Sequence, residues 1–231
     1  MRPIDLKGQY RRRFSGNAAH RDRVWQTILD ERLQQWVGEG KDVLDLGCGW
    51  GEFIRNVRAR SKNAMDLNPD AGQRLGDDIT FLHQDCSDEW PLEDASLDVV
   101  FTSNFIEHLR DKTAVESTLR HLRRCLRDDG RAIFLGPNVK YIPGAYWDFW
   151  DHHVPISHVS LQEVLELSGF RVVTSIPRFL PYTMSGRREA PIALVRLYLR
   201  LPLLWPLFGR QFLVIAEPDT ATPAQRPSIE L

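Results

Sequence analysis

Hydrophobic positions along the chain change between helical spacing and short apolar runs. From residue 24 to 37, apolar side chains recur every three or four positions, the spacing of one face of a helix. Short runs rich in apolar and β-branched residues predict buried strands; they cover residues 42–46, 64–67, 79–82, 97–102, 131–135, 171–176 and 212–216. The pattern predicts an α/β fold with a doubly wound, mostly parallel seven-stranded sheet and helices on both faces.

Local signals refine the ends of these elements. The last run, 212–216, follows the sixth without an ordinary crossover helix, so we expect this strand to be antiparallel. Thr113–Glu116 and Ser160–Glu163 have the spacing of a capping box, which predicts helix starts there. Gly130 and Gly169 are expected to end the two helices.

The same pattern suggests one domain over residues 1–217. Residues 137–160 are rich in aromatic, His and Asp side chains and are interpreted as a substrate loop or lid. Residues 178–210 form an apolar insert before the last strand. Residues 218–231 hold three prolines among small polar residues, and we expect a disordered tail there.

Composition narrows the class of protein. The chain has 231 residues, of which 42% are hydrophobic and 26% charged, and a net charge of −1. This balance is ordinary for a globular protein and argues against a nucleic-acid partner. Cys48, Cys86 and Cys125 are widely spaced, which disfavours disulfides and a cysteine zinc site. The chain shows neither the apolar run of a signal peptide nor 18 consecutive uncharged apolar residues, so we expect a cytoplasmic protein.

The strongest chemical signal is VLDLGCGWGEF, residues 43–53. Asp45 lies at the end of a predicted strand, and Gly47, Gly49 and Gly51 follow before a predicted helix. Glycines permit a tight turn and let a ligand lie against bare backbone. The strand–turn–helix context therefore predicts a cofactor site rather than an ordinary turn.

Glu52 distinguishes between two classes of cofactor. It stands where the dinucleotide fingerprint G-x-G-x-x-G needs glycine or a small residue. An acid at a helix start repels a pyrophosphate. The motif therefore favours S-adenosylmethionine, which carries a sulfonium and an amino group and no phosphate, over NAD.

Two further acids end predicted strands. Asp66 closes the second strand and can accept both hydroxyls of a ribose. Asp85, followed by Cys86, closes the third and can accept an adenine amino group, while a neighbouring backbone N–H binds a ring nitrogen. Each acid alone is also compatible with a turn. Together with Asp45 they place three acids at the carboxyl ends of successive strands, where open α/β sheets bind ligands.

These motifs resemble those of the class I, Rossmann-like S-adenosylmethionine-dependent methyltransferases. VLDLGCGWGEF is similar to the first family motif, MDLNP to the second, HQDCSDEWP to the third and LDVVFTSNFIEHL to the fourth. The resemblance implies three groups of cofactor contacts and one residue near the methyl group. These are Asp45 with the backbone of Gly47, Cys48, Gly49 and Gly51 for the methionine part, Asp66 and Leu67 for the ribose, Asp85 and Cys86 for the adenine, and Asn104 near the methyl group.

Two segments of the sequence contain candidate residues for the acceptor side of the site. Residues 104–108 partly resemble the E-x-x-E-H metal cluster of ubiquinone-biosynthesis O-methyltransferases, but Asn104 replaces the first acid, so no metal is predicted. His108 and His153 are candidate general bases, because histidine titrates near neutral pH. In the alternative interpretation Glu107 braces the loop and the histidines lie at the surface or at a helix start.

The apolar segment Pro191–Phe208 is read in two ways. It packs across the sheet, or it forms a surface that touches lipid or a lipid-linked acceptor. Arg196 and Arg200 lie four residues apart on one helix face and can pair with a phosphate or carboxylate.

Taken together, the sequence predicts an S-adenosylmethionine-dependent methyltransferase. We expect a small-molecule or glycan-type acceptor and no nucleic acid. The alternatives are a non-catalytic protein of the same fold that binds S-adenosylmethionine, and an NAD-type oxidoreductase.

Overall fold

The computed structural model describes residues 18–182 and 189–220, and their strands form one sheet. The strands are β1 (Asp42–Leu46), β2 (Ser61–Asp66), β3 (Ile79–His83), β4 (Leu97–Ser103), β5 (Leu126–Pro137), β6 (Phe170–Leu180) and β7 (Gln211–Pro218). Their order is β3-β2-β1-β4-β5-β7-β6. Neighbours from β3 to β5 pair in parallel, and β7 is antiparallel to both β5 and β6. The predicted fold class and the antiparallel last strand are confirmed.

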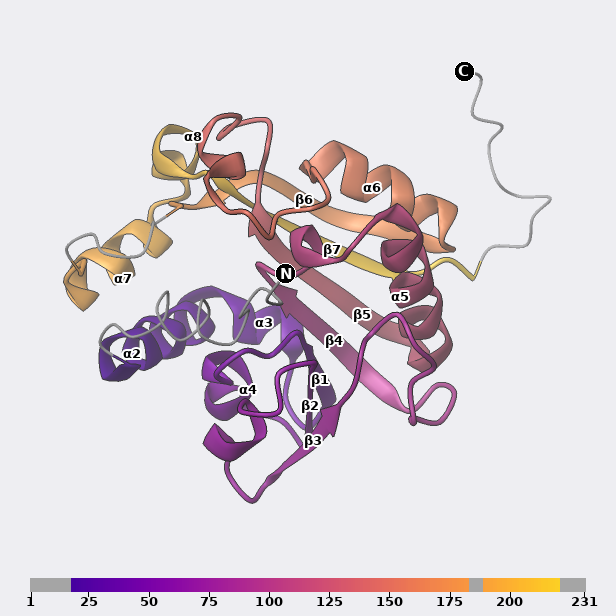
Figure 1. Ribbon diagram of the computed structural model, residues 1–231. Coiled ribbons are helices and arrows are strands. Elements are labelled where there is room, and N and C mark those ends of the chain that lie inside the picture. Colours follow the sequence, from indigo (N-terminus) through magenta and orange to yellow (C-terminus); the bar gives the residue numbers. More distant parts are fainter. Residues whose placement is uncertain (1–17, 183–188, 221–231) are drawn as a thin grey trace, which may run out of the picture.

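Helices cover both faces of this sheet (Figure 1). One face carries α5 (Lys112–Cys125) and α6 (His158–Leu167). The other carries α2 (Ala18–Ile28), the π-helical turn η1 (Leu29–Leu33), α3 (Gln34–Val37), α4 (Glu52–Asn56) and α7 (Ile192–Arg200). Short 3-10 turns are η2 (Gly72–Arg74), η3 (Ile106–His108), η4 (Ala145–Asp148) and η5 (Pro202–Leu204), and α8 (Trp205–Phe208) follows η5.

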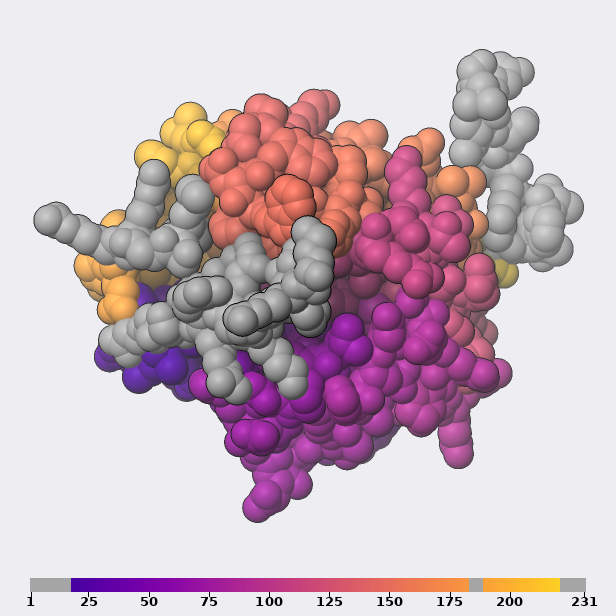
Figure 2. Space-filling model, viewed as in Figure 1, coloured from indigo at the N-terminus to yellow at the C-terminus, as the bar shows by residue number. Residues whose placement is uncertain are grey.

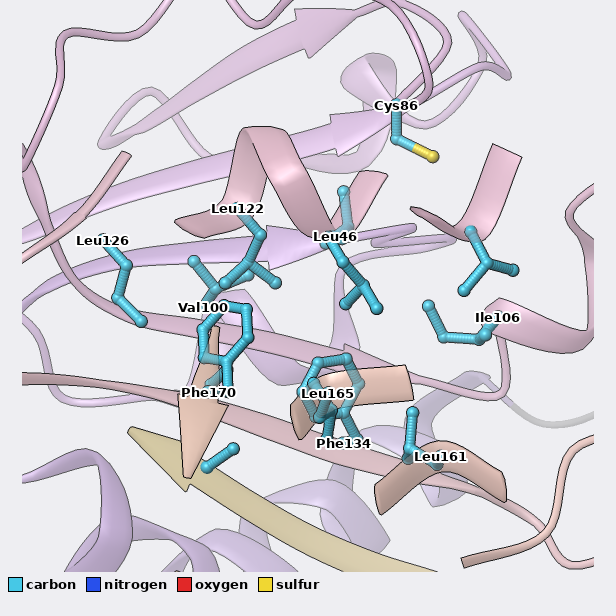
Figure 3. Close-up of a cluster of buried hydrophobic side chains, with 14 of the residues drawn as sticks. Leu46, Cys86, Val100, Ile106, Leu122, Leu126, Phe134, Leu161, Leu165 and Phe170 are labelled. Carbon is cyan, nitrogen blue, oxygen red and sulfur yellow. The ribbon is translucent and has the colours of Figure 1, made fainter. Parts of the chain in front are cut away.

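Side chains of the central strands alternate between two hydrophobic cores. Leu46, Val100 and Phe134 point to the core under α5 and α6, where they meet Leu122 and Leu165 (Figure 3). Their strand neighbours, among them Val43, Phe101 and Ile133, belong to the core under α2, α4 and α7. This two-residue period is the geometry of a sheet buried on both faces, and it explains why the strands read as continuous apolar runs.

The helix starts differ from the predicted capping boxes. Helix α5 begins at Lys112, because Asp111 has extended backbone and its Oδ1 accepts from Ala114 N at 2.8 Å. Thr113 therefore lies inside the first turn, and its predicted capping role is wrong. Helix α6 begins at His158, capped by Ser157, whose Oγ accepts from Ser160 N at 3.1 Å.

Ser160 is thus the N3 residue of a capping box and not its N-cap. Its hydroxyl accepts from Ser157 N at 2.9 Å, completing the reciprocal pair. Gly130 does not end α5, because Leu126 is already extended and opens β5. Gly169 does follow α6, with a left-handed φ of 85°, as predicted.

The C-terminal segments are partly as predicted. Pro218 closes β7 and pairs with Phe170, so the expected disordered tail begins too early at residue 218. Residues 221–231 lie outside the described residues. The predicted insert 178–210 opens with the end of β6 and then holds α7, η5 and α8. No helix among the described residues combines the length and apolar character needed to cross a membrane.

Candidate cofactor and acceptor site

The glycine turn after β1 is built from left-handed backbone. Gly47, Gly49 and Gly51 have φ values of 70°, 55° and 76°, which L side chains rarely adopt. Space is also limited, because a Cβ on Gly47 would lie 2.2 Å from a ring carbon of Phe105. The turn therefore needs glycine for both conformation and packing, and it leaves bare backbone at the carboxyl edge of the sheet.

Asp66 ties this turn to the end of β2. One carboxylate oxygen accepts from Gly49 N at 2.9 Å, and the other accepts from Asn68 N at 2.8 Å. Each carboxylate oxygen has a second lone pair, so Asp66 can still accept ribose hydroxyls. The structure places Asp66 where the ribose contact was predicted; that contact itself stays a prediction.

Asp45 is a buried acid beside other acids. Burial raises the pKa of Asp45 well above its ordinary value, and the negative charges of Asp66 and Glu52 raise it further. Burial also raises the pKa of Asp66, against hydrogen bonds from Asn68 and Gly49. Arg21 donates to Glu52 at 3.0 Å and offsets part of this charge. An ammonium or sulfonium group would relieve the remaining repulsion, so the edge fits a cationic ligand.

The predicted adenine side shows local turns around Asp85. Its Oδ1 accepts from Ser87 N at 2.8 Å and from Ser87 Oγ at 2.7 Å, which shapes the chain after β3. Cys86 and Cys48 are buried, and burial raises the pKa of Cys86 to about 12. Burial also raises the pKa of Cys48, so both side chains stay neutral thiols near neutral pH. Leu67, next to Asp66, is exposed at this edge.

Asn104 follows β4 with a left-handed φ of 49°. Asparagine tolerates this region better than most residues. Its backbone N–H donates to Leu135 O at 2.9 Å, and its side-chain amide donates to Ser103 Oγ at 2.9 Å. The exposed Asn104 therefore lies at the same strand edge as the acids, next to η3.

Three donor groups gather beyond Asn104. Glu107, His108 and His152 each offer an atom within 4.8 Å of the others. Glu107 and His152 are buried, and the His108 and His152 rings meet edge-on, with centroids 4.8 Å apart. Burial raises the pKa of Glu107. One oxygen donor and two imidazoles can act in proton transfer, and they are also a donor set that divalent transition metals accept.

Asp151 orients the His108 ring. Nδ1 of His108 lies 2.9 Å from the Asp151 carbonyl oxygen and 3.3 Å from its carboxylate. A carbonyl only accepts, so Nδ1 carries the proton in this bond and Nε2 keeps its lone pair. Burial lowers the pKa of His108, but the hydrogen bond to Asp151 and the charges of Glu107 and Asp151 outweigh it and raise the pKa above its ordinary value.

The predicted lid is an ordered loop folded around Tyr146. The tyrosine hydroxyl donates to Val154 O at 2.5 Å and accepts from Ile156 N at 3.1 Å. Val154 N and His153 N both donate to Glu107 O, which fastens the loop to η3. The loop thereby holds its polar residues over the end of β4.

His152 rather than His153 points into the cluster. His152 packs against Tyr146 and Phe149, with ring centroids 4.7 Å and 5.1 Å away, whereas His153 is exposed. Asp151 and His152 belong to the predicted loop 137–160, but the sequence pattern does not single them out. The signal that could have found them is their position directly before His153, since consecutive residues of an extended loop face opposite sides.

The two arginines of the apolar insert are already paired. Arg196 Nε lies 3.0 Å from Glu31, and Arg200 donates to both oxygens of that carboxylate at 2.7 Å and 2.9 Å. Glu31 belongs to the π-helical turn η1. Both guanidinium groups pair with this carboxylate, so the two arginines connect α7 to η1 within the chain.

Comparison with known proteins decides the family. A sequence profile described as a methyltransferase domain matches residues 18–175, more than half of the chain. The chain belongs to this methyltransferase family. The match covers the glycine turn, the three acids and the His108 cluster, and the cofactor of the family is S-adenosylmethionine. Family membership thus supports S-adenosylmethionine over the NAD alternative.

Individual relatives agree with this assignment. A probable S-adenosylmethionine-dependent methyltransferase of Mycolicibacterium smegmatis is 30% identical over 147 residues, which cover 61% of this chain and 56% of that protein. The malonyl-[acyl-carrier protein] O-methyltransferase of Serratia marcescens is 33% identical over 44% of each chain. The methyltransferase chain therefore spans about half the length of the curated relatives it matches.

A solved structure shares the fold over nearly the whole chain. A methyltransferase of Archaeoglobus fulgidus that depends on S-adenosylmethionine has a TM-score of 0.64 and 22% identity, and the match covers 92% of this chain and 100% of that one. At this identity the likeness concerns the fold alone. It supports the strand order on which the cofactor edge depends.

Proposed function

We propose that this methyltransferase transfers the methyl group of S-adenosylmethionine to a hydroxyl of a small-molecule or glycan-type acceptor held beneath the loop 138–157. The observation that carries the proposal is the His108 cluster. It places a histidine with a free Nε2 lone pair at the end of β4, next to the cofactor edge. A hydroxyl acceptor must lose a proton during transfer, and His108 can take it.

Different residues at the sheet edge serve the cofactor and the acceptor. Bound S-adenosylmethionine supplies an electrophilic methyl group on a positive sulfur. Asp45 and Asp66 hold the cationic end of that molecule and its ribose, and the glycine turn leaves room for it. Asp151 keeps the His108 ring in the tautomer whose Nε2 accepts the acceptor proton. Tyr146 keeps the loop folded over the cluster, which limits the access of water.

The proposed acceptor class rests on the net charge of the chain and on the exposed aromatic side chains of the loop. The net charge of −1 gives no general attraction for a polyanion, so a nucleic acid is disfavoured. Aromatic side chains of the loop, including Trp147 and Trp150, are exposed. Exposed aromatic rings stack well on the apolar faces of sugars and other flat molecules.

Methyl transfer from labelled S-adenosylmethionine to fractionated cell extract tests the proposal, with mass spectrometry of the labelled product. We expect label in the small-molecule or glycan fraction, and none with His108→Gln. Label that appears only in fractions sensitive to ribonuclease or protease would contradict the proposed acceptor class. A wild-type protein that binds the cofactor without any transfer would favour the non-catalytic alternative.

The donor set also admits a second interpretation of the cluster. Glu107, His108 and His152 together resemble the two-histidine, one-carboxylate sets that hold divalent transition metals. A metal bound there would take the Nε2 lone pair of His108 and remove it as a base. Removal of metal with a chelator separates the two interpretations.

A further inference from the structure

Helix α7 has two different apolar faces. Its inner face, with Leu199 fully buried, packs on the core under α2 and α4, and Tyr198 donates to Phe179 O at 2.7 Å. Its outer face carries Leu194, Leu197 and Leu201, spaced by three and four residues. The outer leucines lie outside the core, because the inner face of α7 already covers it.

The outer leucines continue over η5 and α8. The resulting α7–α8 surface holds six of the twelve large exposed hydrophobic residues of the described chain, all within positions 194–208. Their exposed fractions run from 42% to 88%; they are Leu194, Leu197, Leu201, Leu203, Leu207 and Phe208. Clusters of this kind mark interaction sites, since apolar side chains gain free energy on leaving water.

Positive charge surrounds this surface. Five arginines contact α7 or α8 or belong to their flanks, against two glutamates, which leaves a local net charge of +3 in a chain of −1. The arginines are Arg32, Arg178, Arg196, Arg200 and Arg210, and the glutamates are Glu31 and Glu189. Arg196 and Arg200 stay half-exposed or more although both pair with Glu31.

The surface is better suited to lipid than to protein. A symmetric dimer through this face would bring two patches of charge +3 together, which is repulsive. Protein hot spots favour Trp, Tyr and Arg and are poor in leucine, whereas five of the six exposed residues are leucines and the sixth is Phe208. Leucines on one side of a short helix with arginines beside them are typical of segments that lie in the plane of a membrane interface.

The lengths of the elements agree with an interfacial position. Helix α7 has nine residues and α8 has four, and Pro202 opens the 3-10 turn between them. Neither helix is long enough to cross a bilayer. A kinked pair of short helices can instead lie flat, with the leucines toward the acyl chains and the arginines at the headgroups.

We propose that the α7–α8 surface docks this protein on an anionic lipid bilayer. The proposal does not depend on the acceptor named above, because it concerns binding and not transfer. It does place the acceptor loop near the membrane. Arg178 lies over the Tyr141 ring at 5.1 Å, and Asn138 N donates to Arg210 O at 3.0 Å, so the loop is fastened to the segment that carries α8.

The arrangement of the elements agrees with this placement. Figure 1 shows α8 beside the loop that precedes α6, and Figure 2 shows the two in contact on the surface. A bilayer under α7 and α8 would therefore lie next to the loop. The orientation suits an acceptor whose reactive head stands above a lipid anchor.

Vesicle co-sedimentation of the full chain tests the docking. The probes are vesicles of phosphatidylcholine alone and vesicles of phosphatidylcholine mixed with phosphatidylglycerol. We expect the wild type to sediment with the anionic vesicles, and to do so less as salt rises, since surface charge is screened. Equal binding to neutral and anionic vesicles, or no binding to either, would overturn the proposal.

A double substitution that introduces negative charge locates the contact. Leu203→Glu with Leu207→Glu changes two residues that are 88% and 63% exposed, so the fold should be kept. We expect anionic-vesicle affinity to fall about tenfold or more, since two buried leucines are lost from the interface. The matched control is Val159→Glu with Leu167→Glu on α6, which are 55% and 80% exposed. The control should bind like the wild type.

Two results would assign the surface otherwise. An equal loss in the α6 control would show that added negative charge, and not the α7–α8 leucines, governs vesicle binding. The second result would come from light scattering of the protein without vesicles, which measures its oligomeric state. A dimer that Leu203→Glu with Leu207→Glu converts to a monomer would make a second copy of the chain the occupant. Either result overturns the proposal.

Discussion

Asp66 accepts a hydrogen bond from the backbone N–H of Gly49 at 2.9 Å, which joins the end of β2 to the glycine turn after β1. The Asp66 carboxylate therefore fixes the turn and also lies where the ribose contact is predicted. The same bond explains why the two motifs, which lie 17 residues apart, act as one unit. Changes at either residue should disturb cofactor binding.

Asp66→Ala should weaken the binding of S-adenosylmethionine. Each charge-assisted hydrogen bond that is lost costs about 1.5–3 kcal/mol. Isothermal titration calorimetry measures the affinity, and circular dichroism checks the fold. Asp78→Ala is the control, because Asp78 is 67% exposed at the opposite end of β3, where it pairs with Lys62. Unchanged affinity in a folded Asp66→Ala protein would contradict the ribose contact.

Gly49→Val should abolish cofactor binding. The left-handed φ of 55° at Gly49 costs a side chain about 1–2 kcal/mol, and the branched residue would also crowd the bare backbone of the turn. Gly144→Ala serves as the control, since a Cβ there meets nothing within 4 Å. Thermal unfolding of both variants separates a loss of fold from a loss of site. A folded Gly49→Val protein with wild-type affinity would remove the turn from the site.

The affinity for S-adenosylmethionine should rise with pH through the pKa of Asp45. Burial and the charges of Asp66 and Glu52 raise that pKa in the free protein, so part of the carboxyl is protonated at acid pH. The cationic ligand favours the ionised form, so binding releases a proton. Calorimetry in two buffers of different ionisation enthalpy measures this release. In Asp45→Asn the pH dependence should become smaller, and Asp66, whose pKa is also raised by burial, supplies what remains; an unaltered pH dependence would assign it to another group.

The turnover of the enzyme should depend on His108. His108→Gln is expected to lower the rate by about 10²–10⁴, the usual contribution of a general base, and to leave cofactor affinity unchanged. His153→Gln tests the second candidate from the sequence; its exposed position predicts near wild-type turnover. Equal losses in both variants would show that the partly buried position of the His108 ring is not what matters.

The pH profile gives a sharper test of the same residue. The pKa of His108 lies above its ordinary value, so the ring is protonated at low pH and cannot accept a proton. Turnover should rise as the pH rises through this pKa and then level off. Asp151→Asn removes a charge that raises the pKa, so the rising limb should move to lower pH. A limb that stays in place would separate Asp151 from His108.

Chelation distinguishes base from metal. We expect EDTA to leave turnover unchanged, because His108 Nε2 acts as a proton acceptor. Elemental analysis of the purified protein supplies a readout that is independent of activity. Stoichiometric zinc or iron that is lost in His152→Ala would instead make Glu107, His108 and His152 a metal site.

Much of the cofactor edge can be predicted from the sequence. Asp45 and Asp66 lie at the carboxyl ends of β1 and β2, and Asp85 follows β3; a parallel sheet brings such strand ends to one edge whatever the details of packing. The glycine turn is equally local, since φ values near 70° demand glycine. The order of the apolar runs along the chain is enough to predict the sheet and its antiparallel last strand.

Other features depend on contacts that no local pattern reveals. Glu31 pairs with Arg200, which lies 169 residues away, so the use of the α7 arginines could not be read from their spacing. The capping boxes failed for a different reason. Asp111 and Ser157 have the extended backbone that an N-cap needs, whereas Thr113 and Ser160 also fit the sequence pattern but lie within the first turn.

Competitive calorimetry with S-adenosylhomocysteine and NAD tests whether the edge formed by Asp45, Asp66 and the glycine turn is an S-adenosylmethionine site. We expect the wild-type protein to bind S-adenosylhomocysteine and S-adenosylmethionine at one site, Asp66→Ala to weaken both, and NAD neither to bind nor to compete. Binding of NAD with comparable affinity, or wild-type binding of S-adenosylmethionine by a folded protein that lacks both Asp45 and Asp66, would contradict it.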